Sequence, residues 1–502
     1  MVEELRLTEF SGGIRGQVAA SEAVDTQWLD MRGLVLDDER RLRAQWAAHA
    51  QAVPGGGPLS PAFGRGGDFI AGVRDDGLTL NASLVDALGR ATGWEVVAIP
   101  AGLGTGHRPL TMIPVLNNED EWVTGLLFNR SGPGSAPFAL YRSGGVWAVK
   151  TWPTHYPTLA PTPNSMPRGA EVAATWGSYL VLGNILWMAD DSLAFSTSNR
   201  RRYVNGLWFS QPGDYDSWDP IDVQFIGYRS STLGQNQIVA MYPVEQGLLV
   251  LTTDRIELLR GTPNQHEAET LRVGISPQSP DHVTWWPEAN AVCWVDGSGA
   301  VWACNGEAID RLDQQIEAEA NLRGAPVANV SVAAVGNYLL VTSPNSTWVL
   351  TSFGRDGAWT RLHNRMSHLY ATGMSLYGRR LSAQWRFAVD GSGVRGTLDG
   401  APLVSRLVTR TMPGGGHDTV FWHRHGVRAV GAGTLRQLEY YPDARPVGQS
   451  YTVVVNAPLA ERRDHVVPCH GPSLDSCFAY EFEGDVTVEG VSLWAHEGRA
   501  RR

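Results

Sequence analysis

Pairs of short apolar strands recur along the middle of the chain, and their spacing constrains the fold more than any other feature. In each pair, one apolar run leads through a short polar turn into a second, strongly apolar run. The centres of three second runs, Leu249, Val292 and Leu339, lie 43 and 47 residues apart. Repeats of about 40–50 residues are typical of β-propeller blades. Four such pairs span residues 172–182, 238–251, 282–295 and 330–341.

One four-stranded blade cannot cover both of its faces, whereas blades stacked around an axis bury them. The composition suits this arrangement, because 56 Gly and 19 Trp residues provide tight turns and fill wide cores between sheets. The sequence therefore predicts an all-β fold, with a β-propeller of five or six units over residues 90–400. A series of β-sandwiches is the alternative.

The two ends of the chain differ from this repeat. Residues 1–89 form an irregular N-terminal segment, with a short strand near Leu5, a helix predicted over 37–52 and a loop over 53–75. Residues 401–502 alternate polar and apolar positions, with turns about every ten residues, which predicts a β-sandwich-like domain. We expect both terminal segments to contact other proteins, so that deleting residues 1–60 would leave the propeller folded.

Charge and hydropathy exclude several classes of protein. The net charge is −10, whereas a surface that grips nucleic acid needs a basic excess. The first ten residues are acidic and lack the apolar core of a signal peptide. The longest apolar runs fall short of the ~18 residues of a membrane span.

The sequence contains few residues with the spacing of a chemical site, and we expect no cofactor and no metal. The loop at 102–107 is glycine-rich, but no helix pattern follows it to bind a phosphate. Cys293 and Cys304 flank a hairpin turn and could face each other, although two reduced, buried thiols are the favoured interpretation. The remaining candidates are Cys469 and His470 with Cys477 as a partial zinc site, and His423 with His425 on one strand face, for which packing is favoured over metal binding.

Propellers that cleave glycans carry Ser-x-Asp-x-Gly-x-x-Trp turns, and two segments are similar in outline. The first, 210–218, has Pro212 in place of the aspartate and Asp214 in place of the glycine. The second, 352–359, has Gly354 and Asp356 at those places. Both are interpreted as structural turns, so we expect no enzymatic activity. A glycan-cleaving propeller stays an alternative.

The segment 207–220, Leu-Trp-Phe-Ser-Gln-Pro-Gly-Asp-Tyr-Asp-Ser-Trp-Asp-Pro, is the most specific in the chain. It resembles a segment of the propeller-type tail hub or nozzle proteins of short-tailed bacteriophages, including packaged-DNA-stabilisation proteins. The strands at 238–241 and 248–253, the run 256–261 and the opening at 10–14 add to the resemblance. The motif positions that carry it, as structural residues, are Trp208, Ser210, Gly213, Asp214, Trp218 and Gly261.

The resemblance implies a structural subunit of the virion tail, assembled in the host cytoplasm. Copies of the chain would form a ring, typically a hexamer, below the portal and adaptor. Through its lumen DNA would pass without sequence-specific binding, and the ring would help retain packaged DNA until ejection. The acidic balance suits this role, because a negative wall does not grip phosphate. A receptor-binding tail protein, which recognises host glycans through aromatic pockets, is the second function left open.

Overall fold

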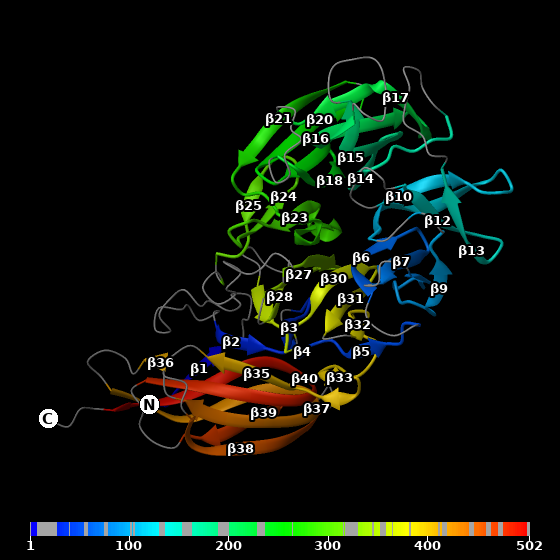
Figure 1. Cartoon of the computed structure of the whole chain (residues 1–502). Helices are drawn as coiled ribbons and strands as arrows, with labels where there is room; N and C mark the ends of the chain where they lie inside the picture. The colour runs from blue at the N-terminus through cyan, green and yellow to red at the C-terminus, as the bar shows by residue number, and fades with distance from the viewer. Residues whose placement is uncertain are drawn as a thin grey trace.

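The protein is described by a computed structural model, and it is built almost entirely of β-strands (Figure 1). The described residues contain two short 3-10 turns, η2 (Pro280–His282) and η3 (Pro287–Ala289). These residues are 2–7, 28–39, 41–54, 59–74, 79–100, 103, 106–129, 136–152, 163–188, 200–227, 236–263, 265–314, 316, 330–343, 346–351, 358–363, 365–380, 383–409, 412–413, 419–440, 446–457, 463–469 and 475–498.

Seven units of four antiparallel strands make up the propeller. Blade 1 consists of β6 (Leu59–Arg65), β7 (Phe69–Arg74), β8 (Thr79–Leu84) and β9 (Glu95–Ala98). Blade 2 consists of β10 (Arg108–Leu116), β11 (Trp122–Asn129), β12 (Phe138–Ser143) and β13 (Val146–Thr151). Blade 3 consists of β14 (Val172–Trp176), β15 (Tyr179–Met188), β16 (Arg200–Gln211) and β17 (Asp214–Phe225). Blades 4 and 5 are β18 (Ile238–Val244), β19 (Gly247–Thr252), β20 (Arg255–Thr262) and β21 (Gln265–Val273); and β22 (Val283–Trp286), β23 (Ala291–Val295), β24 (Val301–Cys304) and β25 (Ile309–Arg311). Blades 6 and 7 are β26 (Val332–Val335), β27 (Tyr338–Thr342), β28 (Thr347–Thr351) and β29 (Ala358–Arg361); and β30 (Ser367–Thr372), β31 (Ser375–Arg380), β32 (Ala383–Phe387) and β5 (Ala48–Gln51).

The first strand of each blade lies innermost, and together these strands surround a central channel. Apolar cores fill the spaces between adjacent blades; one joins blades 2 and 3, the next joins blades 3 and 4, and another joins blades 4 and 5. The all-β propeller predicted from the repeat is confirmed. The repeat indicated five or six units because blade 1 and the outer strand of blade 7 were not recognised as strands.

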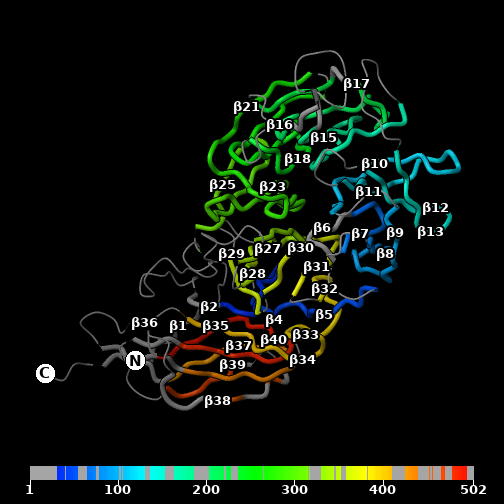
Figure 2. Tube along the Cα trace, viewed as in Figure 1, coloured from blue at the N-terminus to red at the C-terminus, as the bar shows by residue number. Residues whose placement is uncertain are grey.

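Blade 7 closes the ring with a strand from the other end of the chain. The N-terminal strand β5 pairs antiparallel with β32, from Ala48 opposite Phe387 to Gln51 opposite Gln384. Figure 2 shows this meeting of segments far apart in the sequence. Blade 1 is fastened to blade 7 as well, because the Tyr377 hydroxyl donates to the Gly89 carbonyl at 3.1 Å and accepts from the Ala91 N–H at 2.7 Å.

Below the propeller in Figure 1, the C-terminal strands form one large antiparallel sheet. Its centre is a pair of very long strands, and N-terminal strands add to its edge. Besides the strands of blade 6, which join this sheet through the parallel pairing of β29 with β2, its members are β35 (Val404–Thr409), β36 (Met412–Pro413), β37 (Thr419–Tyr440), β38 (Pro446–Ala457), β39 (Arg463–Pro468) and β40 (Asp475–Gly498), with β1 (Val2–Leu7), β2 (Trp28–Arg32), β3 (Leu34–Leu36) and β4 (Leu42–Ala44). Two further short strands, β33 (Thr397–Leu398) and β34 (Ala401–Pro402), extend the sheet of blade 7. The predicted sandwich is not confirmed, because these strands belong to one hydrogen-bonded sheet.

The N-terminal segment departs most from the prediction. The helix predicted over 37–52 is wrong: this stretch contains β4 and β5, and Leu42 and every residue of 44–48 are buried. The loop predicted over 53–75 contains β6 and β7. The predicted propeller range of 90–400 therefore omits most of blade 1 and the closing strand β5. For the same reason, deleting residues 1–60 cannot leave this propeller intact.

Candidate functional site

The motif segment 207–220 forms the hairpin of β16 and β17 in blade 3, and its two tryptophans lie in the core between blades 2 and 3. Trp218 is completely buried and meets Trp208 edge to face, with ring centroids 6.2 Å apart. The Trp208 indole N–H donates to the Asp219 carbonyl at 2.7 Å. These contacts bury both indoles at a joint between two blades, as the sequence predicts for Trp218.

The turn of this hairpin is fixed by the other motif residues. The buried Ser210 hydroxyl accepts a hydrogen bond from the Leu180 N–H at 2.9 Å and donates to the Gln211 carbonyl at 3.0 Å. Gly213 has φ +76°, a conformation that favours glycine, and its N–H donates to the Ser178 carbonyl. Ser210 is therefore engaged in the backbone of its own blade, not presented as a nucleophile.

Acidic residues of the same hairpin hold blade 2. One carboxylate oxygen of Asp216 lies 3.1 Å from the ammonium of Lys150, the only lysine of the chain, and 3.1 Å from the indole nitrogen of Trp152. Burial, reinforced by a hydrogen bond with Asp216, raises the pKa of Asp214. Asp216 thus links blade 3 to blade 2, and Asp214 is hydrogen-bonded to Asp216 within the hairpin.

Gly261, the sixth motif residue, lies apart from the others, at the end of β20 in blade 4. Its φ is +115°, and a Cβ there would lie 2.4 Å from the Gln265 carbonyl oxygen. Its N–H donates to the Gln246 carbonyl at 3.0 Å. The structure thus brings five motif residues together in one hairpin and leaves Gly261 in the next blade, where it shapes a turn.

The cysteine and histidine candidates have structural positions. Cys293 lies opposite Ala303, and Cys304 lies opposite Val292, so the two thiols are one register step apart and enter different cores. Both are free, buried thiols, and burial raises the pKa of each. His425 is buried against Phe478, and its Nδ1 lies 3.2 Å from the Tyr480 hydroxyl.

Other candidates lie wholly or partly outside the described residues. These are half of the 102–107 loop, most of the 352–359 turn, His470, and the side chains of His423 and Cys477. Within the described part of the chain, no three His, Cys, Asp or Glu side chains are grouped as a metal site would require. The described residues also form no helix long and apolar enough to cross a membrane.

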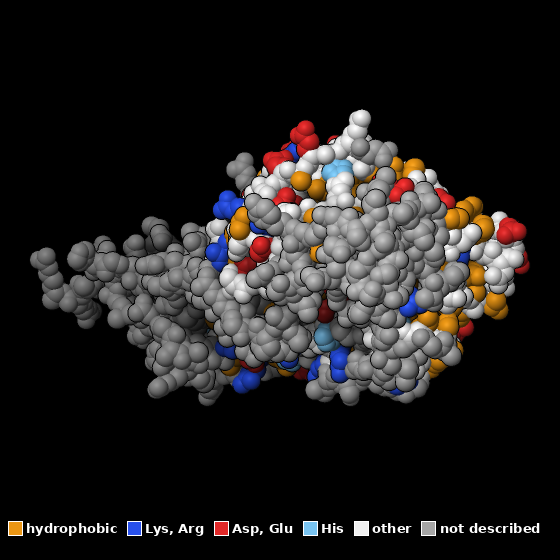
Figure 3. All heavy atoms as spheres, turned by 45° about the horizontal axis from the view of Figure 1, so that its top comes forward, with side chains coloured by type: hydrophobic (Ala, Val, Ile, Leu, Met, Phe, Trp, Pro, Cys, Tyr) orange, Lys and Arg blue, Asp and Glu red, His pale blue; other side chains and the backbone are white. Residues whose placement is uncertain are grey.

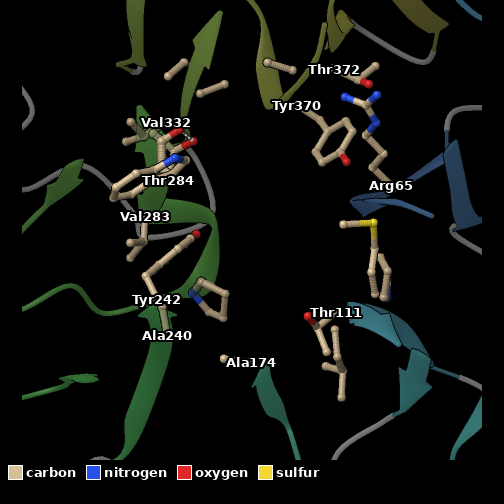
Figure 4. A pocket seen from close by; sticks show the side chains of 18 of the residues that line it. Arg65, Thr111, Ala174, Ala240, Tyr242, Val283, Thr284, Val332, Tyr370 and Thr372 are labelled. Atoms are coloured by element: carbon tan, nitrogen blue, oxygen red, sulfur yellow. Dashed lines mark hydrogen bonds between the residues drawn. The ribbon is translucent and has the colours of Figure 1, made fainter. Parts of the chain in front are cut away.

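The central channel is a cavity with a volume of about 850 Å³. Part of the channel is lined by small apolar residues, which include Ala174, Ala240 and Val332 (Figure 4). Its charged lining residues are Arg65, Arg108, Glu171, Asp281 and Glu288. Sequence reasoning found none of these, because the lining side chains come from seven strands that are distant in the sequence.

The mouth at the start of the inner strands carries charges from different blades. The Glu171 carboxylate accepts hydrogen bonds from the amides of Asn184 at 3.1 Å and Gln237 at 3.2 Å. Asp281 lies in η2, with a carboxylate oxygen 4.0 Å from His368 Nδ1. Burial among the channel walls raises the pKa of Asp281 to about 6, and the positive charge of Arg108 opposes this effect. The Asp281 side chain is nevertheless 34% exposed, and it lines the channel.

The raised pKa of Asp281 makes stability fall as pH rises. The folded state holds the proton up to about pH 6, whereas an unfolded Asp releases it near pH 3.9, so the folded form binds more protons between these values. We expect Asp281→Asn to have a higher urea midpoint than the wild type at pH 7.5 and an equal one near pH 4. Asp310→Asn, at an exposed carboxyl, is the control. A pH-independent difference for Asp281→Asn would contradict the expectation.

Comparisons with known proteins do not assign the chain to a family. No protein-family model and no curated protein matches the sequence. Among solved structures, BamB from Moraxella catarrhalis is 14% identical with a TM-score of 0.37, covering 69% of this chain and 100% of that chain. The Pan2 WD40 domain from Neurospora crassa is 11% identical with a TM-score of 0.37, covering 70% and 97%, and apo AztD from Citrobacter koseri is 12% identical with 0.36, covering 62% and 87%. Similarity this low supports no functional argument, so the propeller rests on the chain's own strand order.

Proposed function

We propose that the chain is a non-enzymatic structural subunit of a bacteriophage tail, repeated in a ring that continues the DNA channel. The observation that carries the proposal is the role of the motif hairpin. The resemblance to tail hub and nozzle proteins depends on this hairpin, and its residues serve as a joint between blades 2 and 3. Related structural proteins are expected to share the residues that pack their blades together, whereas related enzymes are expected to share catalytic residues. A resemblance that depends on packing residues therefore favours a structural role.

The surface charge favours a protein past which DNA moves without being bound. The net charge is −10, and on the face in Figure 3 the described Lys and Arg side chains lie at separate places among acidic and apolar ones. Such a surface gives little of the phosphate neutralisation on which non-specific DNA binding depends. The propeller channel, at about 850 Å³, has the size of a small-ligand pocket. DNA would therefore pass through the opening of the ring, outside the propeller.

A closed ring is built from head-to-tail contacts, so each copy presents two different surfaces to its neighbours. The partners proposed are further copies of this chain, six in all, with the portal or adaptor above and other tail proteins below. Assembly would take place in the host cytoplasm and end in the virion. A receptor-binding tail protein is the alternative with support from the structure, through the aromatic residues at one channel mouth.

Electron microscopy of the purified full-length chain and of labelled particles tests the proposal. We expect ring-shaped oligomers around an opening wide enough for a DNA duplex, and label repeated around the tail axis. We also expect the chain not to retain DNA at physiological salt. A chain that stays monomeric at high concentration and is found singly at a fibre tip would contradict the ring and favour the receptor-binding alternative.

A further inference from the structure

The channel mouth at the carboxyl ends of the inner strands differs from the charged mouth at their starts. Each blade repeats the same up-and-down path, so residues late in the inner strands share one mouth. This aromatic mouth, as we name it, is lined by Arg65, Thr111, Tyr242, Trp285, Tyr370 and Thr372, and by Glu288 in η3, which directly follows the end of β22. Figure 4 shows Arg65, Tyr370 and Thr372 on one side of the open space and Tyr242 on the other.

Arg65 supplies a cation that the described part of the protein does not neutralise. Its Nε donates to the Gly67 carbonyl at 2.9 Å, which holds the side chain in place. Among the described residues, no carboxylate lies within ion-pairing distance of its guanidinium. The terminal N–H groups are thus available to a ligand, and a guanidinium binds a carboxylate through two parallel hydrogen bonds.

Two tyrosines add neutral hydroxyl groups to this mouth. Burial raises the pKa of Tyr370, and the positive charge of Arg65 opposes that rise. Tyr370 lies on the same side of the open space as Arg65, and Tyr242 lies across it (Figure 4). Burial also raises the pKa of Tyr242 to about 12. Both phenols are therefore neutral at physiological pH and can donate or accept hydrogen bonds. With Thr111 and Thr372, they form a lining suited to a ligand that carries several hydroxyl groups.

The charges of the whole channel limit the ligand further. The described lining carries two cations, Arg65 and Arg108, against three carboxylates, Glu171, Asp281 and Glu288. At the aromatic mouth these charges reduce to Arg65 and Glu288. A ligand with two negative charges would be repelled by the acidic excess of the channel, whereas a single ligand carboxylate can be neutralised by Arg65. Aromatic rings such as Trp285 offer apolar faces for the C–H surface of a ring-shaped ligand.

We propose that the aromatic mouth binds an acidic sugar of monosaccharide size, with its carboxylate on Arg65 and its hydroxyls on Tyr242 and the threonines. The cavity of about 850 Å³ falls within the range of ligand sites. This inference does not depend on the tail ring, because binding takes place within one copy of the chain.

Saturation-transfer NMR and calorimetry on the full-length chain test the proposal. The probes are glucuronic acid and N-acetylneuraminic acid, with glucose, benzoate and inorganic phosphate as comparisons. We expect the acidic sugars to bind more tightly than all three comparisons. Arg65→Gln should weaken their binding roughly tenfold to a hundredfold, the usual effect of losing a charge-assisted hydrogen bond.

Two further variants make the result specific. Tyr242→Phe removes one hydroxyl and should weaken the acidic sugars severalfold while leaving benzoate unchanged. Arg272→Gln, on the exposed strand β21, is the matched control and should change nothing. The proposal is overturned if neither acidic sugar binds, if Arg65→Gln binds them as the wild type does, or if phosphate or benzoate binds equally well. None of these outcomes would bear on ring assembly.

Discussion

Trp218→Ala is expected to lower the free energy of unfolding by about 3–5 kcal/mol, the cost of truncating a fully buried aromatic side chain. The indole is completely buried between blades 2 and 3, where it meets Trp208 edge to face. The cavity would open at a joint between two sheets, so neither blade could collapse into it alone. Urea titration of the full-length chain, followed by circular dichroism, measures the change.

Trp122→Ala is the matched control, because Trp122 lies in the neighbouring blade and is 60% exposed. The surface substitution should change stability by less than about 0.5 kcal/mol. Trp218→Phe should lie between the two, since a smaller ring fills part of the space. If Trp218→Ala and Trp122→Ala unfold at the same urea concentration, the joint assigned to the motif hairpin is wrong.

The middle of the propeller could be predicted because strands that pair with each other there are neighbours in the sequence. The pairs at 172–182 and 238–251 became β14 with β15 and β18 with β19. Buried apolar residues on both strands of a pair, separated by a short polar turn, are sufficient to indicate a hairpin.

The N-terminal strands could not be predicted in the same way because their partners lie far along the chain. The stretch 37–52 is rich in Ala, Arg and Gln, which favour a helix in isolation. Pairing of β5 with β32 overrides this preference. In the sequence, the apolar residues Leu42, Ala44, Trp46 and Ala48 occupy every second position, and this period of two was the available signal.

The channel could not be predicted from the sequence for a related reason. Arg65, Tyr242 and Tyr370 come from blades 1, 4 and 7, and no local motif links them. Their meeting depends on closure of the ring and on the number of blades. The motif hairpin, by contrast, is one continuous segment, so its position as a structural joint followed from the resemblance and from its buried tryptophans.

Removing residues 1–54 is expected to abolish the folded state of the rest of the chain. The deletion takes β5 from blade 7 and exposes the edge of β32. It also removes Met31, Leu34 and Leu36 from the core shared with the C-terminal sheet, and several kcal/mol per buried side chain exceeds the usual stability margin of a domain. Expression of residues 55–502 alone should give aggregated protein without a cooperative unfolding transition.

Coexpression of residues 1–54 as a separate chain distinguishes loss of the closing strand from general damage. Strands are bound by an exposed sheet edge without a covalent link, so the fragment should restore soluble protein and travel with 55–502 on gel filtration. A fragment with Ala50→Pro should rescue less, because Ala50 lies opposite Trp385 within the β5–β32 pair. If 55–502 folds cooperatively by itself, β5 does not close the ring. The terminal segment would then be free for contacts within the particle, as the sequence alone suggested.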